Sequence, residues 1–163
     1  MITLTRRYHF SASHRLHSAA LGEAENARLY GKCNNPYGHG HDYVLEVTVA
    51  GNIDETTGLL LPIARLDRLV QNQVLHLFSH RNLNLDLPQF ARLVPTTENV
   101  ALVIAELLER QWHLLNDSQT GTAPRLHRVH VQETDRNGFE VLIGAPQNKS
   151  LLDFQHESVT VNA

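Results

Sequence analysis

The chain has 163 residues and a formal net charge of −3, and 42% of its residues are hydrophobic against 19% charged. These values predict one domain large enough for its own core, and they argue against a nucleic-acid binder, which usually carries a basic excess. The single cysteine excludes an intrachain disulfide framework. The sequence has no secretory pattern and no apolar run of ~20 residues, so a cytoplasmic protein with no membrane partner is predicted.

The first third of the chain has the alternation of apolar and polar residues that is typical of strands. It is loose over residues 2–14 and clean over 39–50, so two strands are predicted. Between them, residues 15–38 are polar and contain several glycines and asparagines, which predicts a long loop of the kind that is usually functional. After a turn, the apolar segment 59–61 is predicted to be a short strand that forms a hairpin with 39–50.

The middle of the chain has helical spacing. Apolar residues recur three and four positions apart over 63–78 and again from about 97 to 115, which predicts two amphipathic helices. Residues 116–124 are polar and are predicted to be a linker.

The last predicted elements are strands. Segments 126–134 and 139–143 are predicted to form a hairpin closed by residues 135–138, whose Asn137-Gly138 suits a tight turn, and one more strand is predicted near 158–161. The order of two strands, two helices and two strands indicates an α+β domain, with helices on one face of an antiparallel sheet. We expect a single domain over 1–163, with a core at about 2–143 and a C-terminal extension at 144–163. The exposed sheet edges favour oligomerisation.

Three of the eleven histidines form the best candidate metal site. His39 and His41 are two positions apart on a predicted strand, so they point to the same face as Tyr43. His14 ends the first strand and would lie beside them if the two strands pair. Three neutral imidazoles leave one zinc position open, as in catalytic zinc sites.

Two alternatives to this site stay open at the level of residue patterns. The His-x-His spacing also occurs in surface turns that bind no metal. His76 and His80, four apart on the first predicted helix, are a rival pair, although a histidine at a helix end also suits the helix dipole.

Cys33 lies in the predicted loop, next to Lys32 and six residues before His39. A thiol next to a cation and close to a metal site is placed to act as a base or a nucleophile. The alternative is a small buried side chain, but the polar, asparagine-rich surroundings argue against burial.

Residues 30–43 resemble the signature of the 6-pyruvoyl-tetrahydropterin synthase family, which also includes 6-carboxy-tetrahydropterin synthases. Further segments are similar to the family in the same order along the chain: 10–16, Ser79 to Asn84, Pro95 to Asn99 and Val131 to Thr134. The resemblance covers about residues 8–143. It implies the tunnelling fold: two helices on one face of a four-stranded antiparallel sheet, with trimers closing a barrel and two trimers stacking into a homohexamer.

The resemblance also implies an activity. The family converts 7,8-dihydroneopterin triphosphate to 6-pyruvoyl-tetrahydropterin and eliminates triphosphate, as a carbon–oxygen lyase acting on phosphates in tetrahydrobiopterin biosynthesis. It implies zinc on His14, His39 and His41, with Mg²⁺ as a companion ion of the triphosphate.

By the same resemblance, each of the remaining site residues has a role. Cys33 would be the base, and His80 would belong to a proton relay. Glu133 would anchor the pterin through two parallel hydrogen bonds, and Glu98 and Thr97 would line the pterin pocket. On charge alone, three cations are candidates to hold triphosphate: Arg15, Lys32 and Arg81.

The sequence departs from the family pattern at Ser79, where the family has Asp, and at Pro62, where it has Asn or Asp. Serine cannot supply the negative charge that orients the relay histidine, although Asp42 or Asp86 could supply it in space. Three alternatives therefore stay open: a 6-carboxy-tetrahydropterin synthase, an enzyme that cleaves dihydroneopterin, and a pterin- and zinc-binding homologue with weakened catalysis.

Overall fold

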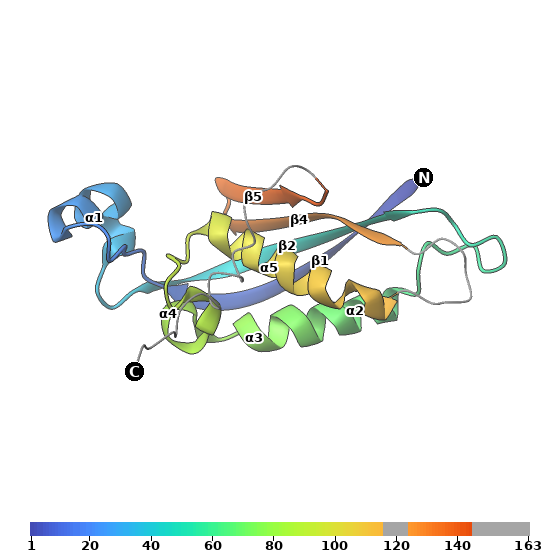
Figure 1. The fold of residues 1–163 in the computed structure, drawn as a ribbon, viewed down its shortest axis with the longest axis horizontal. Helices are drawn as coiled ribbons and strands as arrows, with labels where there is room; N and C mark the ends of the chain where they lie inside the picture. The colour runs from blue at the N-terminus through green and yellow to red at the C-terminus, as the bar shows by residue number, and fades with distance from the viewer. Residues whose placement is uncertain (116–123, 145–163) are drawn as a thin grey trace, which may run out of the picture.

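Two long antiparallel strands, β1 (Ile2–His14) and β2 (His39–Gly51), run through the centre of the fold. They pair along their full length, from Ile2 opposite Gly51 to His14 opposite His39. The computed structural model describes residues 1–115 and 124–144. Within them the strands form one sheet whose helices lie on one side (Figure 1). The α+β class predicted from the sequence is confirmed.

The sheet has five strands, in the order β3-β1-β2-β4-β5, rather than the four expected. The strands β4 (Arg125–Thr134) and β5 (Asn137–Leu142) form the predicted hairpin and extend the antiparallel sheet from β2. The extra strand, β3 (Arg81–Asn82), pairs in parallel with the end of β1. Two residues are too few to show an alternating pattern, so no residue pattern indicated β3.

Both predicted helices are confirmed. The first comprises α2 (Ile63–Val70), a π-helical turn η2 (Gln71–Leu75) and α3 (His76–Phe78), which follow one another without a break. The second comprises α5 (Thr97–Gln111) and the 3₁₀ turn η4 (Trp112–Leu115). Two shorter pieces, α4 (Leu83–Asp86) and η3 (Pro88–Phe90), connect them.

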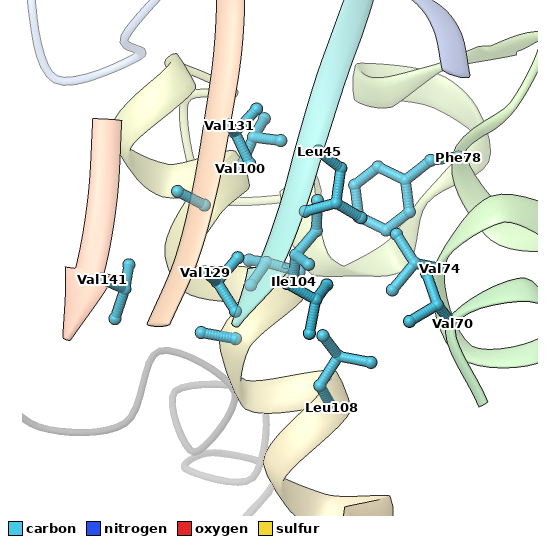
Figure 2. Packing of buried hydrophobic residues seen from close by; sticks show 14 of the residues in the cluster. Leu45, Val70, Val74, Phe78, Val100, Ile104, Leu108, Val129, Val131 and Val141 are labelled. Carbon is cyan, nitrogen blue, oxygen red and sulfur yellow. The ribbon is translucent and has the colours of Figure 1, made fainter. Parts of the chain in front are cut away.

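The core lies between the sheet and these two helices (Figure 2). Strand residues such as Leu45 and Val129 are fully buried against helix residues such as Ile104. Burying one such side chain contributes roughly 1.5–3 kcal/mol before entropy is counted. The metal-site candidates lie in line with this core, because Phe10, Ala12 and His14 are buried in alternation along β1.

The segment 15–38 is not a loop throughout, as predicted, because it contains α1 (Glu23–Tyr30) and the 3₁₀ turn η1 (Gly31–Asn34). In Figure 1, α1 projects at one end of the sheet. Its only buried residue is Asn26, whose amide nitrogen donates to the carbonyl oxygens of Ser18, Leu21 and Gly22. Because a buried amide rather than an apolar face holds α1, the sequence shows no amphipathic pattern there.

One local prediction on the hairpins is wrong. Residues 59–61 form no strand, because Asp54 organises this loop by accepting hydrogen bonds from the backbone N–H and the hydroxyl of Thr57. The β4–β5 turn lies within the predicted 135–138, at 135–136, and Asn137-Gly138 already belongs to β5. A Cβ on Gly138 would lie 2.6 Å from Nε2 of His130, so a larger residue there would displace this side chain.

Several predictions fall wholly or mainly on residues 116–123 and 145–163. These are the linker at 116–124, the strand near 158–161 and the C-terminal extension, and they lie outside the described residues. Among the residues that the structure describes, no helix combines the length and the apolar character needed to cross a bilayer.

Candidate metal centre and active site

His14, His39 and His41 converge at the end of the β1–β2 pair, as predicted. His14 lies opposite His39, and Ala12 lies opposite His41. One ring nitrogen from each histidine lies within 4.8 Å of the other two, in the one such metal-binding group found among residues 1–115 and 124–144. The pairing of two regular strands sets this arrangement, so it does not depend on a loop.

The distance between two of the ring nitrogens fits a tetrahedral ion. Nε2 of His14 and Nε2 of His39 are 3.2 Å apart. Two corners of a tetrahedral zinc site with Zn–N bonds of ~2.0–2.1 Å are separated by about 3.3 Å. Nε2 of His41 is buried and has no hydrogen-bond partner among the described residues, which is the expected state of a ligand atom without its ion.

The protonation of His14 favours metal binding. Its Nδ1 lies 2.8 Å from the carbonyl oxygen of Pro95, which can only accept, so Nδ1 carries the proton and Nε2 keeps its lone pair for the cluster. Burial lowers the pKa of His14, and the carbonyl of Pro95 and the charge of Glu133 oppose this shift. Burial also lowers the pKa of His39, and His41 adds to the effect. Neutral imidazoles, the form that binds metals, are therefore favoured.

Pro95 connects the cluster to the start of α5. The side chain of Thr96 caps this helix by accepting a hydrogen bond from the backbone N–H of Asn99. Thr97 is buried, whereas Glu98 is exposed in the first turn. The predicted pterin-pocket residues Thr97 and Glu98 therefore follow Pro95, which holds His14, by two and three positions. Glu98 makes no contact with the histidine cluster.

Glu133 reaches the cluster itself. Its Oε1 lies 3.6 Å from Nε2 of His14 and 3.7 Å from Nε2 of His41. A carboxylate at this position can accept a hydrogen bond from a group that binds beside the histidines. Its predicted contact with the pterin ring stays a prediction. The sequence did not reveal that Glu133 lies next to the histidine cluster.

Tyr43 is a site neighbour that the sequence analysis did not assign a role. It is fully buried, and its hydroxyl lies 3.5 Å from Nδ1 of His14. Burial raises its pKa, and the nearby Glu133 and Cys33 raise it further. Its alternation in phase with His39 and His41 was the signal that could have identified it. The half-buried Cys33 lies in η1, where its carbonyl oxygen accepts a hydrogen bond from the backbone N–H of Leu16.

His80 does not lie on the first helix, so the rival pair with His76 is not formed on one helix face. The helix ends at Phe78, and His80 has a left-handed backbone with φ of 59°. Its N–H donates to the carbonyl oxygen of Ser11 over 2.6 Å, immediately before β3. Non-glycine residues in this conformation often occur at functional sites.

The side chain of His80 lines a shallow groove of about 630 Å³ that also includes His41, Asp42, Asp86 and Arg81. Asp42 accepts a hydrogen bond from the hydroxyl of Ser11, and Asp86 accepts one from the backbone N–H of Asn82. Among the described residues, no carboxylate lies within ion-pair distance of His80. Both candidates to replace the family Asp therefore share its groove without contacting it.

Comparison with known proteins agrees with this geometry. Residues 3–142 match the family model described as 6-pyruvoyl tetrahydropterin synthase. The human 6-pyruvoyl tetrahydrobiopterin synthase is 44% identical over 134 residues, which cover 82% of this chain and 86% of that protein. The protein of the same name from Poecilia reticulata is 43% identical, over 82% of this chain and 85% of its own length.

A solved structure is similar as well. The 6-pyruvoyl tetrahydropterin synthase of Caenorhabditis elegans superposes with a TM-score of 0.76 at 38% identity, covering 86% of this chain and 94% of that one. The fold resemblance expected from the motifs is thereby confirmed.

Proposed function

The chain belongs to the 6-pyruvoyl tetrahydropterin synthase family, and on that premise we propose that it is a zinc-dependent carbon–oxygen lyase. Its proposed substrate is 7,8-dihydroneopterin triphosphate, which it converts to 6-pyruvoyl-tetrahydropterin with loss of triphosphate. The observation that supports this most directly is the cluster of three histidine nitrogens with the Glu133 carboxylate beside it.

His14, His39 and His41 would hold the zinc ion, with the Pro95 carbonyl fixing the ring of His14. When bound, zinc would supply Lewis acidity, which polarises substrate hydroxyls and acidifies the protons near them. The three imidazoles would leave one position for the substrate.

Proton transfer would then depend on residues of the chain. Cys33 would take a proton from the substrate side chain, because its half-buried position leaves the thiol accessible. Glu133 would accept a hydrogen bond from a substrate hydroxyl next to the histidines. His80 would return a proton, and Asp42 or Asp86 would supply the negative charge that Ser79 lacks.

Assembly is a further part of the proposal. The outer edge of β5 and most of the outer edge of β1 have no strand beside them in the described part of the chain. Edges of this kind are suited to pairing between copies. We propose the homohexamer that the family resemblance implies, which light scattering after size-exclusion chromatography would test.

The test of the activity is direct. Zinc-loaded protein is incubated with 7,8-dihydroneopterin triphosphate, and the product mass and the released triphosphate are measured. We expect one equivalent of triphosphate and 6-pyruvoyl-tetrahydropterin. A product with a shortened, carboxylated side chain would indicate a 6-carboxy-tetrahydropterin synthase instead. The absence of triphosphate release from a zinc-loaded, folded sample would refute the lyase assignment.

A further inference from the structure

Two hollows adjoin the histidine cluster, and their charged residues differ. One is the groove of His80, which contains the carboxylates of Asp42 and Asp86. The other, which we call the basic hollow, has a volume of about 620 Å³ and is lined by Arg15, Arg92 and His17, with no carboxylate in its wall. The basic hollow therefore favours the binding of an anion, whereas the groove contains carboxylates as well as basic side chains.

Two residues that flank the candidate metal ligands in the chain lie in the wall of the basic hollow. Arg15 follows His14 in the chain, and Gly38, which precedes His39, lines the same wall. Gly38 has a φ of 71°, and a Cβ on it would lie 2.8 Å from the carbonyl oxygen of His14. A glycine is needed here for this close approach. The hollow therefore lies against the backbone that carries His14 and His39.

Arg15 is held in place but keeps free donors. Its backbone N–H donates to Oδ1 of Asn84, whose amide nitrogen donates back to the carbonyl oxygen of Arg15. Its Nε donates to the carbonyl oxygen of Asn34 over 3.0 Å. Among the described residues, its two η nitrogens have no partner. An arginine fixed in this way loses little side-chain entropy when it binds an anion.

The second arginine is more open. Arg92 is exposed, and within residues 1–115 and 124–144 it forms no ion pair. By contrast, Arg6, Arg7 and Arg128 each bind a carboxylate. Arg15 and Arg92 are therefore cations whose charge the described part of the chain leaves uncompensated, and they line one cavity. Guanidinium groups bind phosphate oxygens through two parallel hydrogen bonds.

We infer that the basic hollow is the triphosphate subsite, with Arg15 and Arg92 as the residues that bind the polyanion. This inference rests on the proposed function for the identity of the substrate. Of the three cations that the sequence suggested for triphosphate binding, this inference keeps only Arg15. Arg81 lines the groove, and Lys32 lines neither cavity.

The subsite also has a role in the elimination. As the base removes the C–H proton, the C–O bond to triphosphate breaks and its electron pair stays on the departing phosphate oxygen, while a carbon–carbon double bond forms. Two guanidinium groups beside the leaving group would stabilise this developing negative charge.

The first experiment measures binding without turnover. Inorganic tripolyphosphate is titrated calorimetrically into metal-free protein, so that chelation of zinc by the probe does not contribute. The variants are Arg15→Gln, Arg92→Gln and the double variant. Arg125→Gln is the matched control, since Arg125 is exposed at the opposite end of the sheet, paired with Ala50.

We expect each single variant to lose about tenfold or more in affinity, and the control to match the wild type. Arg15→Lys keeps the charge and should retain part of the affinity, which separates loss of the cation from loss of the fold. Affinity that is unchanged in the double variant, or that appears only in zinc-loaded protein, would overturn the assignment.

A second experiment separates this inference from the proposed function. The Michaelis constant for dihydroneopterin triphosphate should rise in both arginine variants, whereas the binding of dihydroneopterin, which lacks phosphate, should not change. If no lyase product forms but tripolyphosphate still binds through both arginines, the function is wrong and the anion subsite stands. If turnover occurs and is unaffected by either substitution, the subsite is wrong and the function stands.

Discussion

The histidine cluster and the groove of His80 share His41, but they are built in different ways. The cluster rests on two fully paired strands, and each of its ligands has a position set by register and burial. The groove depends on a two-residue strand and on a residue with a left-handed backbone, and its carboxylates do not contact His80. One chain therefore suffices to bring the three histidines together, whereas no carboxylate contacts His80 among the described residues.

The largest expected effect comes from removing a ligand. His39→Ala should reduce zinc content at least a hundredfold. The substitution removes one of the three histidine ligands, and the two that remain cannot impose tetrahedral geometry on the ion. The measurement is metal content after dialysis against a weak chelator. His9→Ala, an exposed histidine on the same strand as His14, is the control and should leave zinc binding intact.

Removing the histidine of the groove should separate metal binding from catalysis. His80→Ala should lower kcat by about 10²–10⁴ while the zinc content stays at the wild-type level, because a positioned acid–base group contributes on that order. Kinetics and metal analysis on the same preparation would check this. A parallel loss of zinc would show that groove and cluster are one unit.

Changes to the charge beside His80 should have intermediate effects. Ser79→Asp restores the carboxylate of the family pattern and should raise kcat, by up to tenfold. Asp86→Asn should lower it, with a shift in the pH profile of kcat, if Asp86 supplies the charge. Asp42→Asn is the matched comparison. If both Asn variants keep the wild-type rate and pH profile, neither aspartate replaces the family residue.

Acid should destabilise the metal-free protein through the histidine cluster. Burial lowers the pKa values of His14 and His39 in the fold, so the unfolded chain binds protons more readily than the folded one. The stability contributed by these neutral rings is complete above the unfolded pKa of about 6.5 and is lost as the pH falls through the lower folded values. The melting temperature of metal-free protein should therefore fall below about pH 6.5, and His14→Gln should flatten this dependence.

The smallest effect is expected from Tyr43. Tyr43→Phe removes only a hydroxyl at 3.5 Å from His14, so the free energy of unfolding should fall by about 1 kcal/mol and zinc affinity only a few-fold. Denaturant titration and competition with a chelator would measure both. A loss of zinc as large as that of His39→Ala would show that the hydroxyl is essential to the cluster.

The metal site was largely predictable from the sequence, because strand periodicity is a local property. Alternation placed His39 and His41 on one face, and the pairing of two predicted strands brought His14 to them. The contact of Pro95 with His14 joins residues that are 81 positions apart, and it uses a backbone carbonyl that every residue type possesses. No residue pattern can indicate such a contact.

The misassigned segments have a common cause. In α1 the buried amide of Asn26 replaces an apolar face, and in the loop before α2 the carboxylate of Asp54 replaces strand pairing. Hydrogen bonds from single polar side chains organise both regions. Such bonds leave no periodic trace in the sequence, in contrast to the core helices, whose apolar spacing predicted them correctly.

The hydrogen bond from His14 to Pro95 has one more consequence. Through this bond, an ion that holds the ring of His14 in place would also restrain the first turn of α5. Amide hydrogen exchange at Asn99 and Val100 should then slow when zinc is added, although neither residue is a ligand. Hydrogen exchange at the start of this helix would thus report how much metal is bound, even in the absence of substrate.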